Sequence, residues 1–160
     1  MRIPEIYLET TIFNFPFADD APQYKADTLK LFEEIGQGKF KPYTSEYVIE
    51  ELEAAGDANR DVRLDLIRKY AVEIIPANEK AGNLASAYVE SGIIPDKYSA
   101  DARHIAVASI KGLDFIVSLN FRHIVKRKTI EGVELINFRE GYKRIGIYSP
   151  AEVIEYGKDI

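Results

Sequence analysis

The sequence contains no cysteine, which excludes several classes of site. Thiol nucleophiles, thiolate metal centres, zinc ribbons and disulfide frameworks all require that residue. The composition fits a reducing compartment, and 46% hydrophobic residues supply enough apolar side chains for a core without disulfides. At a length of 160 residues, the simplest expectation is one domain spanning residues 1–160.

Long apolar runs are also missing. No segment approaches the roughly 20 apolar residues that are needed to cross a membrane. The first apolar run is broken by Pro4 and Glu5, so we expect no secretory signal. These observations predict a soluble, cytoplasmic protein that makes no use of a membrane.

The chain also lacks an excess of positive charge. Its formal net charge is -5, so there is no global basic field of the kind that a general nucleic-acid binder carries. A polyanionic partner would have to be met locally. One local cluster is available, and it is either a solvated surface turn or a phosphate-binding segment: Arg122, Lys126, Arg127 and Lys128.

There is no low-complexity segment, internal repeat or Ser/Gly linker, and no phosphate-binding glycine loop or nucleophile elbow. The chain instead alternates short apolar strands with helical patterns. Strands are predicted at residues 5–8, 41–45, 71–76, 114–118, 132–138 and near 145–148. Helices are predicted at residues 25–36, 46–55, 62–70, 78–91, from an N-cap at Ser99 to Lys111, and from Pro150 onward. This alternation favours a three-layer α/β/α domain with a central, mostly parallel sheet.

Polar side chains follow several of these strands. Glu9 directly follows the first strand, and Asn120 lies just past the strand at 114–118. Glu51 is on the helix after the second strand, and Asp101 is in the first turn of its helix. Because ligands of open α/β sheets bind beyond the carboxyl ends of the strands, these side chains are candidates for one site.

Each candidate also has a structural interpretation. Asp101 would compensate a helix dipole, an effect worth about 0.3–1 kcal/mol. Glu9 would cap the helix that follows it, and Asn120 would form a turn. On its helix, Glu51 flanks the apolar face, but Glu53 is nearly as close, so helical periodicity does not distinguish the two.

Four segments occur in a characteristic order: "YLETTIF", "YTSEYVIEEL", "DARHIAVAS" and "DFIVSLNFRHI". Taken together, they resemble the PIN-domain nucleases, and most closely their VapC-like toxin ribonucleases. The likeness covers about residues 6–137. The tail "GYKRIGIYSPAEVI" is similar to an extension in a subset of such proteins, which implies that residues 138–160 pack on the domain as a C-terminal extension.

The resemblance implies that the four acidic positions of the family fall on Glu9, Glu51, Asp101 and Asn120. Most of the family has aspartate where this chain has Glu9, and many members have aspartate in place of Asn120. A further acid that some members carry is replaced by His123. The missing charge at Asn120 makes a single metal ion more consistent with this chain than two.

The implied activity is metal-dependent hydrolysis of RNA phosphodiester bonds. Mg²⁺ or Mn²⁺ would be bound by Glu9 and Asp101, because these ions take hard oxygen ligands together with water. Glu51 or Asp101 would accept a proton from the attacking water, which the carboxamide of Asn120 cannot do. The hydroxyls of Thr11 and Ser118 either support the ligands by hydrogen bonds or act as ordinary caps.

The remaining interpretations concern the histidines, the partners and the alternative functions. His104 is expected to be a packing residue, and His123 to contact backbone or RNA. RNA would bind at the basic segment defined above, and the family implies a homodimer and an antitoxin protein. The alternatives are a catalytically weakened PIN-fold module that binds RNA or protein without cleavage, and a phosphate-ester hydrolase acting on small molecules.

Overall fold

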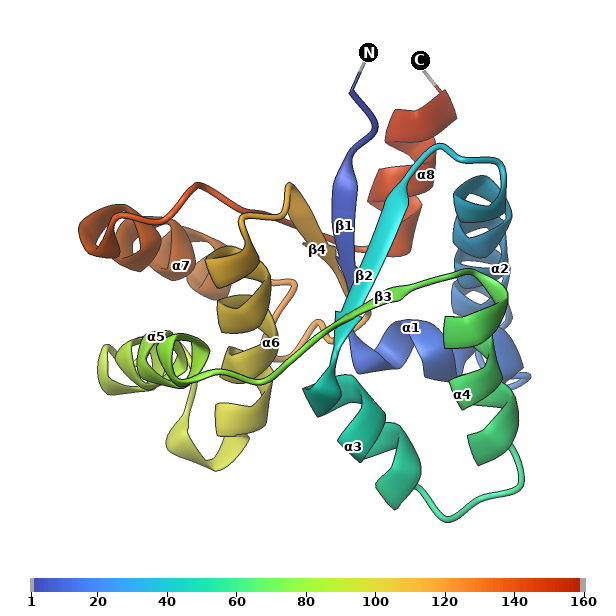
Figure 1. Ribbon diagram of the computed structural model, residues 1–160, viewed down its shortest axis with the longest axis horizontal. Coiled ribbons are helices and arrows are strands. Elements are labelled where there is room, and N and C mark those ends of the chain that lie inside the picture. The colour runs from blue at the N-terminus through green and yellow to red at the C-terminus, as the bar shows by residue number, and fades with distance from the viewer. Residues whose placement is uncertain (1, 159–160) are drawn as a thin grey trace.

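The protein is built around one sheet of five parallel strands, in the order β3-β2-β1-β4-β5. The computed structural model describes residues 2–158, with side chains through residue 154 (Figure 1). The strands are β1 (Glu5–Leu8), β2 (Lys41–Ser45), β3 (Glu73–Ile75), β4 (Phe115–Val117) and β5 (Gly146–Tyr148). Parallel pairing of every neighbouring pair places all the carboxyl ends at one edge of the sheet.

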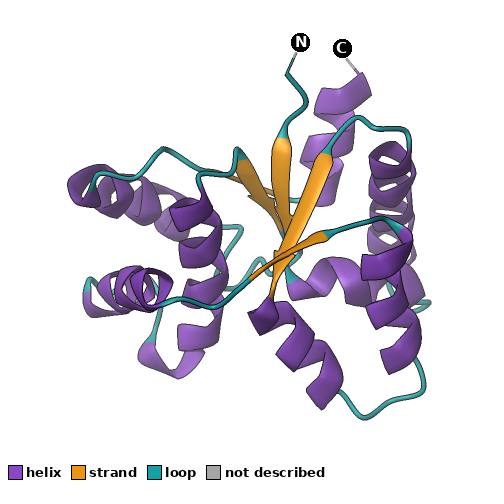
Figure 2. Ribbon diagram, in the orientation of Figure 1, coloured by secondary structure: helices purple, strands orange, loops and turns teal. Residues whose placement is uncertain are grey.

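Helices connect successive strands and cover both faces. In Figure 1, α5, α6 and α7 lie on one side of the sheet, and α2, α4 and α8 lie on the other. Figure 2 shows the strands between these two helical layers. The predicted three-layer architecture is therefore confirmed. The bounds are α1 (Thr10–Asn14), α2 (Pro22–Gly36), α3 (Glu46–Ala54), α4 (Arg60–Lys69), α5 (Glu79–Glu90), α6 (Ser99–Lys111), α7 (Arg127–Glu140) and α8 (Pro150–Lys158), with short 3-10 turns at Phe15–Phe17 and Asp96–Tyr98.

The two central strands explain why the sequence shows continuous apolar runs rather than alternation. In β1, Ile6, Tyr7 and Leu8 are fully buried, and in β4, Ile116 and Val117 are fully buried. A strand covered by helices on both faces turns no side chain to water, so both of its faces are apolar. These strands form the centre of the core and fix the positions of the residues that follow them.

One predicted strand, at residues 132–138, is wrong, because this segment belongs to α7. Its hydrophobic residues fit both a period of two and a helical period. The structure buries Val133 and Ile136, which are three residues apart, and leaves Leu135 70% and Phe138 84% exposed. Burial at helical spacing therefore decided the element, whereas the sequence showed only that the segment was apolar.

The predicted start of α6 also needs correction. Ser99 is the first residue of the helix and not its N-cap, since a 3-10 turn at Asp96–Tyr98 leads directly into it. The N-cap position is taken by Tyr98, whose side chain makes no capping hydrogen bond. By contrast, Asn78 caps α5 as predicted, and its Oδ1 accepts a hydrogen bond from the Ala81 amide at 2.8 Å.

The predicted extension, residues 138–160, includes the end of α7, the edge strand β5 and α8, while residues 159–160 lie outside the described part of the chain. β5 pairs in parallel with β4, and α8 packs against α2. Within residues 2–158, no helix has the length and apolar character that crossing a membrane requires.

The packing of α7 against the end of α5 depends on Gly132. A Cβ at this position would lie 2.5 Å from Cγ1 and 2.7 Å from Cδ1 of Ile93, well inside van der Waals contact. A Cβ at Gly82, in α5, would meet nothing within 4 Å. Gly82→Ala therefore measures helix propensity alone, and Gly132→Ala measures the same gain combined with a steric clash.

We expect Gly132→Ala to have a lower free energy of unfolding than Gly82→Ala by about 1–3 kcal/mol, the usual cost of overpacking. Gly82→Ala itself should be stabilised by up to about 1 kcal/mol relative to wild type. Chemical denaturation of the wild type and both variants provides the comparison. Equal stabilisation of the two variants would mean that Ile93 moves aside without cost.

At the amino edge of the sheet, Asp114 holds three segments together. Its carboxylate accepts hydrogen bonds from Arg2 at 2.8 and 2.9 Å, from the Glu5 amide at 2.7 Å and from Lys143 at 3.0 Å. These partners, with the Arg2 hydrogen bond as the largest influence, hold the pKa of Asp114 well below its usual value. Asp114 therefore links the chain before β1 to the starts of β4 and β5.

Asp114→Asn should lower the free energy of unfolding near neutral pH, since charge-assisted hydrogen bonds are lost. The loss should be only about 1–2 kcal/mol, because Arg2 is well exposed and solvent weakens its ion pair. A depressed pKa stabilises the folded state above the unfolded value of 3.8, and this contribution is lost as the pH falls through the folded value. The difference between wild type and variant should thus narrow as the pH falls below about 4. Urea titrations across that range test this, with the exposed Asp65→Asn as control; a difference independent of pH contradicts it.

Candidate active site

Glu9 lies at the carboxyl end of β1, where the sheet gives way to α1. It is the N-cap of that helix, and its Oε1 accepts a hydrogen bond from the Thr11 amide at 3.2 Å. The same oxygen accepts hydrogen bonds from the hydroxyls of Thr11 and Ser118, each at 2.6 Å. Glu9 therefore caps a helix, as its structural interpretation proposed, and is also joined to the segment after β4.

Burial determines the electrostatics of this carboxylate. Glu9 is only 3% exposed. Burial raises its pKa, while the charge of His104 and the hydrogen bonds from Ser118 and Thr11 act in the opposite direction without cancelling it. A buried carboxylate whose ionised form is disfavoured would gain from a nearby cation.

The two hydroxyls also fix the loop that carries Asn120. Thr11 Oγ1 accepts a hydrogen bond from the Leu119 amide at 2.8 Å, and Ser118 Oγ accepts one from the Asn120 amide at 2.9 Å. Asn120 Oδ1 in turn accepts a hydrogen bond from the His123 amide at 2.9 Å. Thr11 and Ser118 thus connect Glu9 to the loop after β4, and Asn120 forms the turn there.

The structure gives Glu51 and Glu53 different contacts. Glu51 Oε1 lies 2.6 Å from Nε2 of His104, which joins α3 to α6, whereas Glu53 is exposed on α3. Burial raises the pKa of Glu51, but the hydrogen bond and charge of His104 outweigh it, so the pKa is lowered. Glu51 is therefore an ionised acid at this edge, with a side chain that remains 40% exposed.

Asp101 lies in the first turn of α6, and Figure 1 shows that this end of the helix is near the carboxyl edge of the sheet. Burial raises its pKa, a hydrogen bond from the Asn120 side chain and the charges of the two histidines lower it, and the charge of Glu51 raises it further. The net result is a raised pKa. The electrostatics of Asp101 is thus linked to both Asn120 and Glu51.

His104 is hydrogen-bonded to Glu51 and is influenced by the charges of all three acids. Burial lowers its pKa, but the hydrogen bond to Glu51 and the charges of Glu51, Glu9 and Asp101 outweigh burial, so the pKa is raised. The packing interpretation from the sequence was incomplete: His104 is 1% exposed, and both of its ring nitrogens are engaged in hydrogen bonds. The available sequence signal was its position three residues after Asp101, on the same helical side.

The basic segment begins in the turn after Asn120 and continues into α7. All four of its side chains are exposed: Arg122, Lys126, Arg127 and Lys128. The guanidinium of Arg122 lies 5.8 Å from the ring centre of Tyr98, which itself stacks on His123 with ring centres 3.9 Å apart. Arg122 is therefore held next to the first turn of α6.

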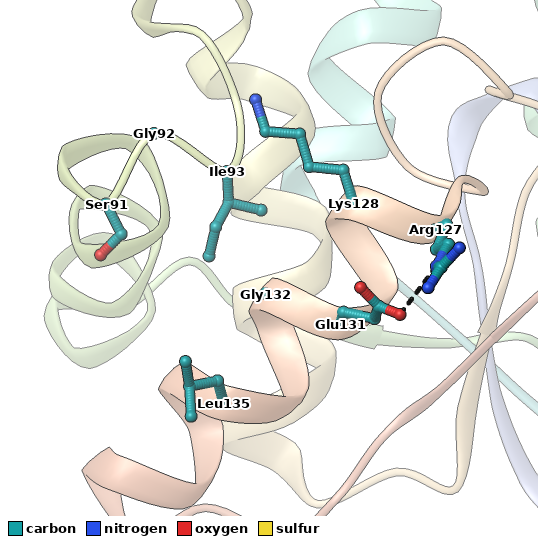
Figure 3. A pocket seen from close by; sticks show the side chains of 8 residues that line it. All are labelled: Ser91, Gly92, Ile93, Arg127, Lys128, Glu131, Gly132 and Leu135. Atoms are coloured by element: carbon teal, nitrogen blue, oxygen red, sulfur yellow. Dashed lines mark hydrogen bonds and ion pairs between the residues drawn. The ribbon is translucent and has the colours of Figure 1, made fainter.

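The other end of the basic segment borders a shallow pocket between α7 and the end of α5. In Figure 3, Arg127 is turned toward Glu131, with which it forms a hydrogen-bonded ion pair of 2.9 Å, while Lys128 extends away from that pair. The pocket is also lined by Ile93 and Leu135, and by none of the acids at the carboxyl edge of the sheet. It is therefore separate from the candidate active site.

No protein-family model matches this chain, and no curated protein sequence matches it significantly. A solved structure does. A chain of the crystal structure of VapBC2 from Rickettsia felis bound to a DNA fragment from their promoter matches with a TM-score of 0.50 and 19% sequence identity. The match covers 71% of this chain and 86% of that chain. The chain has a PIN-like fold. The resemblance found in the sequence is confirmed at the level of the fold.

Within this PIN-like fold, the four predicted positions come from β1, α3, α6 and the turn after β4. Glu51 is hydrogen-bonded to His104, the charges of Glu9 and Asp101 also raise the pKa of His104, and the Asn120 side chain lowers the pKa of Asp101. In the described part of the chain, no group of three or more His, Asp and Glu side chains is spaced to hold a metal ion by itself. The acids at this edge therefore do not form a closed cage.

Proposed function

We propose that this chain is a metal-dependent endoribonuclease that hydrolyses RNA phosphodiester bonds, and that it is the toxin of a toxin-antitoxin pair. The observation that supports this best is that three carboxylates, those of Glu9, Glu51 and Asp101, all act electrostatically on His104 at the carboxyl edge of a PIN-like fold. Mutual repulsion and burial make such a cluster unfavourable by itself, and a divalent cation would relieve both.

The donor set fits a partly hydrated Mg²⁺ or Mn²⁺. Glu9 and Asp101 would hold the ion, since both are buried or half-buried carboxylates with raised pKa values. Mg²⁺ usually takes one or two carboxylates and keeps several waters, so a closed cage is not required. His104 is unsuited as a ligand, because its ring nitrogens already engage Tyr7 and Glu51.

The side chains around that position would divide the chemistry between them. A bound Mg²⁺ or Mn²⁺ supplies charge neutralisation at the phosphate and a more acidic water. Glu51 is ionised and partly exposed, so it would accept the proton of the attacking water. Asp101 would position that water. Asn120 has no basic form and would orient water or phosphate by hydrogen bonds. Thr11 and Ser118 keep Glu9 in one orientation.

The basic segment would bind the RNA backbone. Arg122 lies beside the first turn of α6, so a strand of RNA held by Arg122 and Lys126 would pass over the acids. Arg127 is already paired with Glu131, so we expect it to contribute less to RNA binding. Affinity for RNA should fall as the salt concentration rises, because each phosphate contact releases counterions.

The toxin assignment is supported by the likeness to a chain of a VapBC2 complex. An antitoxin needs an apolar surface to cover, and the outer face of α7 presents two large exposed side chains, Leu135 and Phe138. We propose a small antitoxin protein and a homodimer as the partners of this chain. Co-purification of a small protein encoded beside it would support the pair.

The decisive test is cleavage of an end-labelled RNA by the purified chain with Mg²⁺, with Mn²⁺, and with EDTA. Cleavage should require one of the ions, stop in EDTA and return when the ion is added in excess. Full activity in EDTA would refute the role of the metal.

One observation favours a second function, a module that binds RNA or protein without cleaving. Glu9 already receives three hydrogen bonds on one oxygen, which is also what a purely structural cap would show. Calorimetric titration separates the two functions. Binding of RNA without uptake of Mn²⁺ at millimolar concentrations would favour the module.

A further inference from the structure

A chain of hydrogen bonds runs from the centre of the sheet to Glu51. The hydroxyls of Ser45 and Tyr7 are 2.7 Å apart, and the Tyr7 hydroxyl is 2.7 Å from Nδ1 of His104. Nε2 of His104 is 2.6 Å from Oε1 of Glu51. The chain therefore links the end of β2, β1, α6 and α3, four elements that meet near the carboxyl edge of the sheet (Figure 1).

Three of the four hydrogen-bonded residues are inaccessible to water, and only Glu51 is partly exposed. Ser45 and Tyr7 are fully buried and His104 is 1% exposed, while the Glu51 side chain is 40% exposed. Buried polar groups are unfavourable unless every member has a partner, so such a network holds its members in one geometry. A packing role alone would be served better by apolar side chains, and here the polar chain ends at a partly exposed carboxylate.

The direction of the hydrogen bonds follows from the two ends. Glu51 is ionised and can only accept, so His104 donates through Nε2–H. Burial raises the pKa of Tyr7 well above its usual value, so its hydroxyl keeps its proton. With neutral His104, Tyr7 donates to Nδ1 and accepts from Ser45; with protonated His104, Nδ1–H donates to the Tyr7 hydroxyl, which then donates to Ser45. The ring is thus held from behind with its Nε2–H directed at the carboxylate.

We propose that His104 is a positioning residue which, held by Tyr7 and Ser45, fixes the Glu51 carboxylate for proton transfer. This inference rests on the proposed nuclease function. The Glu51 side chain is 40% exposed, so this long flexible side chain needs an anchor to hold its carboxylate in one place. His104 provides that anchor from the neighbouring helix.

Two substitutions of His104 separate its two contacts. The amide nitrogen of glutamine replaces Nε2 and keeps the hydrogen bond to Glu51, whereas asparagine reaches Tyr7 but falls short of Glu51. His104→Asn should lower kcat for RNA cleavage by about 10- to 100-fold, as loss of an orienting partner commonly does. His104→Gln should lose less, and KM for RNA should stay unchanged in both. Equal losses of kcat in both variants would overturn the proposal.

A double-mutant cycle tests whether His104 acts through Glu51. In a Glu51→Gln background, His104→Asn should add much less than its single effect, because the group that it positions is no longer a base. If the two losses of kcat multiply in the double variant, His104 acts independently of Glu51, and the proposal is overturned.

The chain offers a matched control for the hydroxyl of Tyr7. Tyr88 is also fully buried, and its hydroxyl donates to Asn137 and contacts Ser109, among α5, α6 and α7. Tyr7→Phe and Tyr88→Phe should cost comparable stability, but only Tyr7→Phe should lower kcat. Equal kcat values for the two variants would mean that Tyr7 contributes to packing alone.

Nuclear magnetic resonance provides a readout that needs no activity. The sequence has only two histidines, so a sample labelled with ¹⁵N at histidine gives two sets of ring signals. The Nε2–H of His104 should exchange slowly in the wild type and rapidly in Glu51→Ala. Unchanged exchange would overturn the positioning contact, whereas absence of RNA cleavage by the wild type with this signal intact would refute the nuclease function alone.

Discussion

Asp101→Asn is expected to lower the rate of RNA cleavage by about 10²- to 10⁴-fold, the range associated with loss of an acid or base at a reacting centre. Asp101 is half-buried, lies next to Asn120 and feels the charge of Glu51. The substitution keeps the size and polarity of the side chain while removing its charge, so folding should be preserved. Gel-based cleavage of labelled RNA in Mg²⁺ or Mn²⁺ measures the loss.

Asp96→Asn is the matched control for this experiment. Asp96 is exposed in the 3-10 turn that leads into α6, five residues before Asp101. The Asp96→Asn variant should retain wild-type cleavage, because the Asp96 carboxylate is exposed to solvent and contacts none of the acids at the carboxyl edge of the sheet. Retention of full activity by Asp101→Asn would remove that carboxylate from the reaction.

Glu9→Gln should abolish most cleavage and at the same time stabilise the protein by about 0.5–2 kcal/mol, since active sites often hold groups at the expense of stability. Burial raises the pKa of Glu9, which means that the fold disfavours its ionised form. The amide oxygen of glutamine still accepts the hydrogen bonds from Thr11 and Ser118, so the cap of α1 is kept. Thermal unfolding in the absence of divalent ions measures the gain.

Glu34→Gln is the control for activity in this pair. Glu34 is also fully buried, but it lies on α2, away from the carboxyl edge of the sheet. Its Oε1 is 3.7 Å from Nζ of Lys39, which comes just before the amino end of β2. It should leave cleavage unchanged. A Glu9→Gln protein that is less stable than the wild type would show that the ionised carboxylate is the preferred form, and that Glu9 serves the fold rather than a metal.

Much of the fold followed from local patterns. The apolar runs of β1 and β4 predicted strands buried on both faces, and Asn78 predicted the start of α5. The segment at residues 132–138 failed, because its apolar residues suited both periods and only the packing of Val133 and Ile136 against the core distinguished them. The local sequence shows that a segment is apolar, while the side chains that become buried show whether it is a helix or a strand and which face packs on the core.

The sequence by itself determined where the candidate polar groups stand relative to the strands, because an acid or amide that follows a buried strand must emerge at the carboxyl edge of a parallel sheet. The tertiary structure alone decided which side chains meet there. The contact that distinguishes Glu51 from Glu53 depends on how α3 lies against α6, since it joins residues 53 positions apart. The role of His104 depends on Tyr7 and Ser45, which come from two other strands. No local pattern encodes such contacts, since they arise only when separate elements pack.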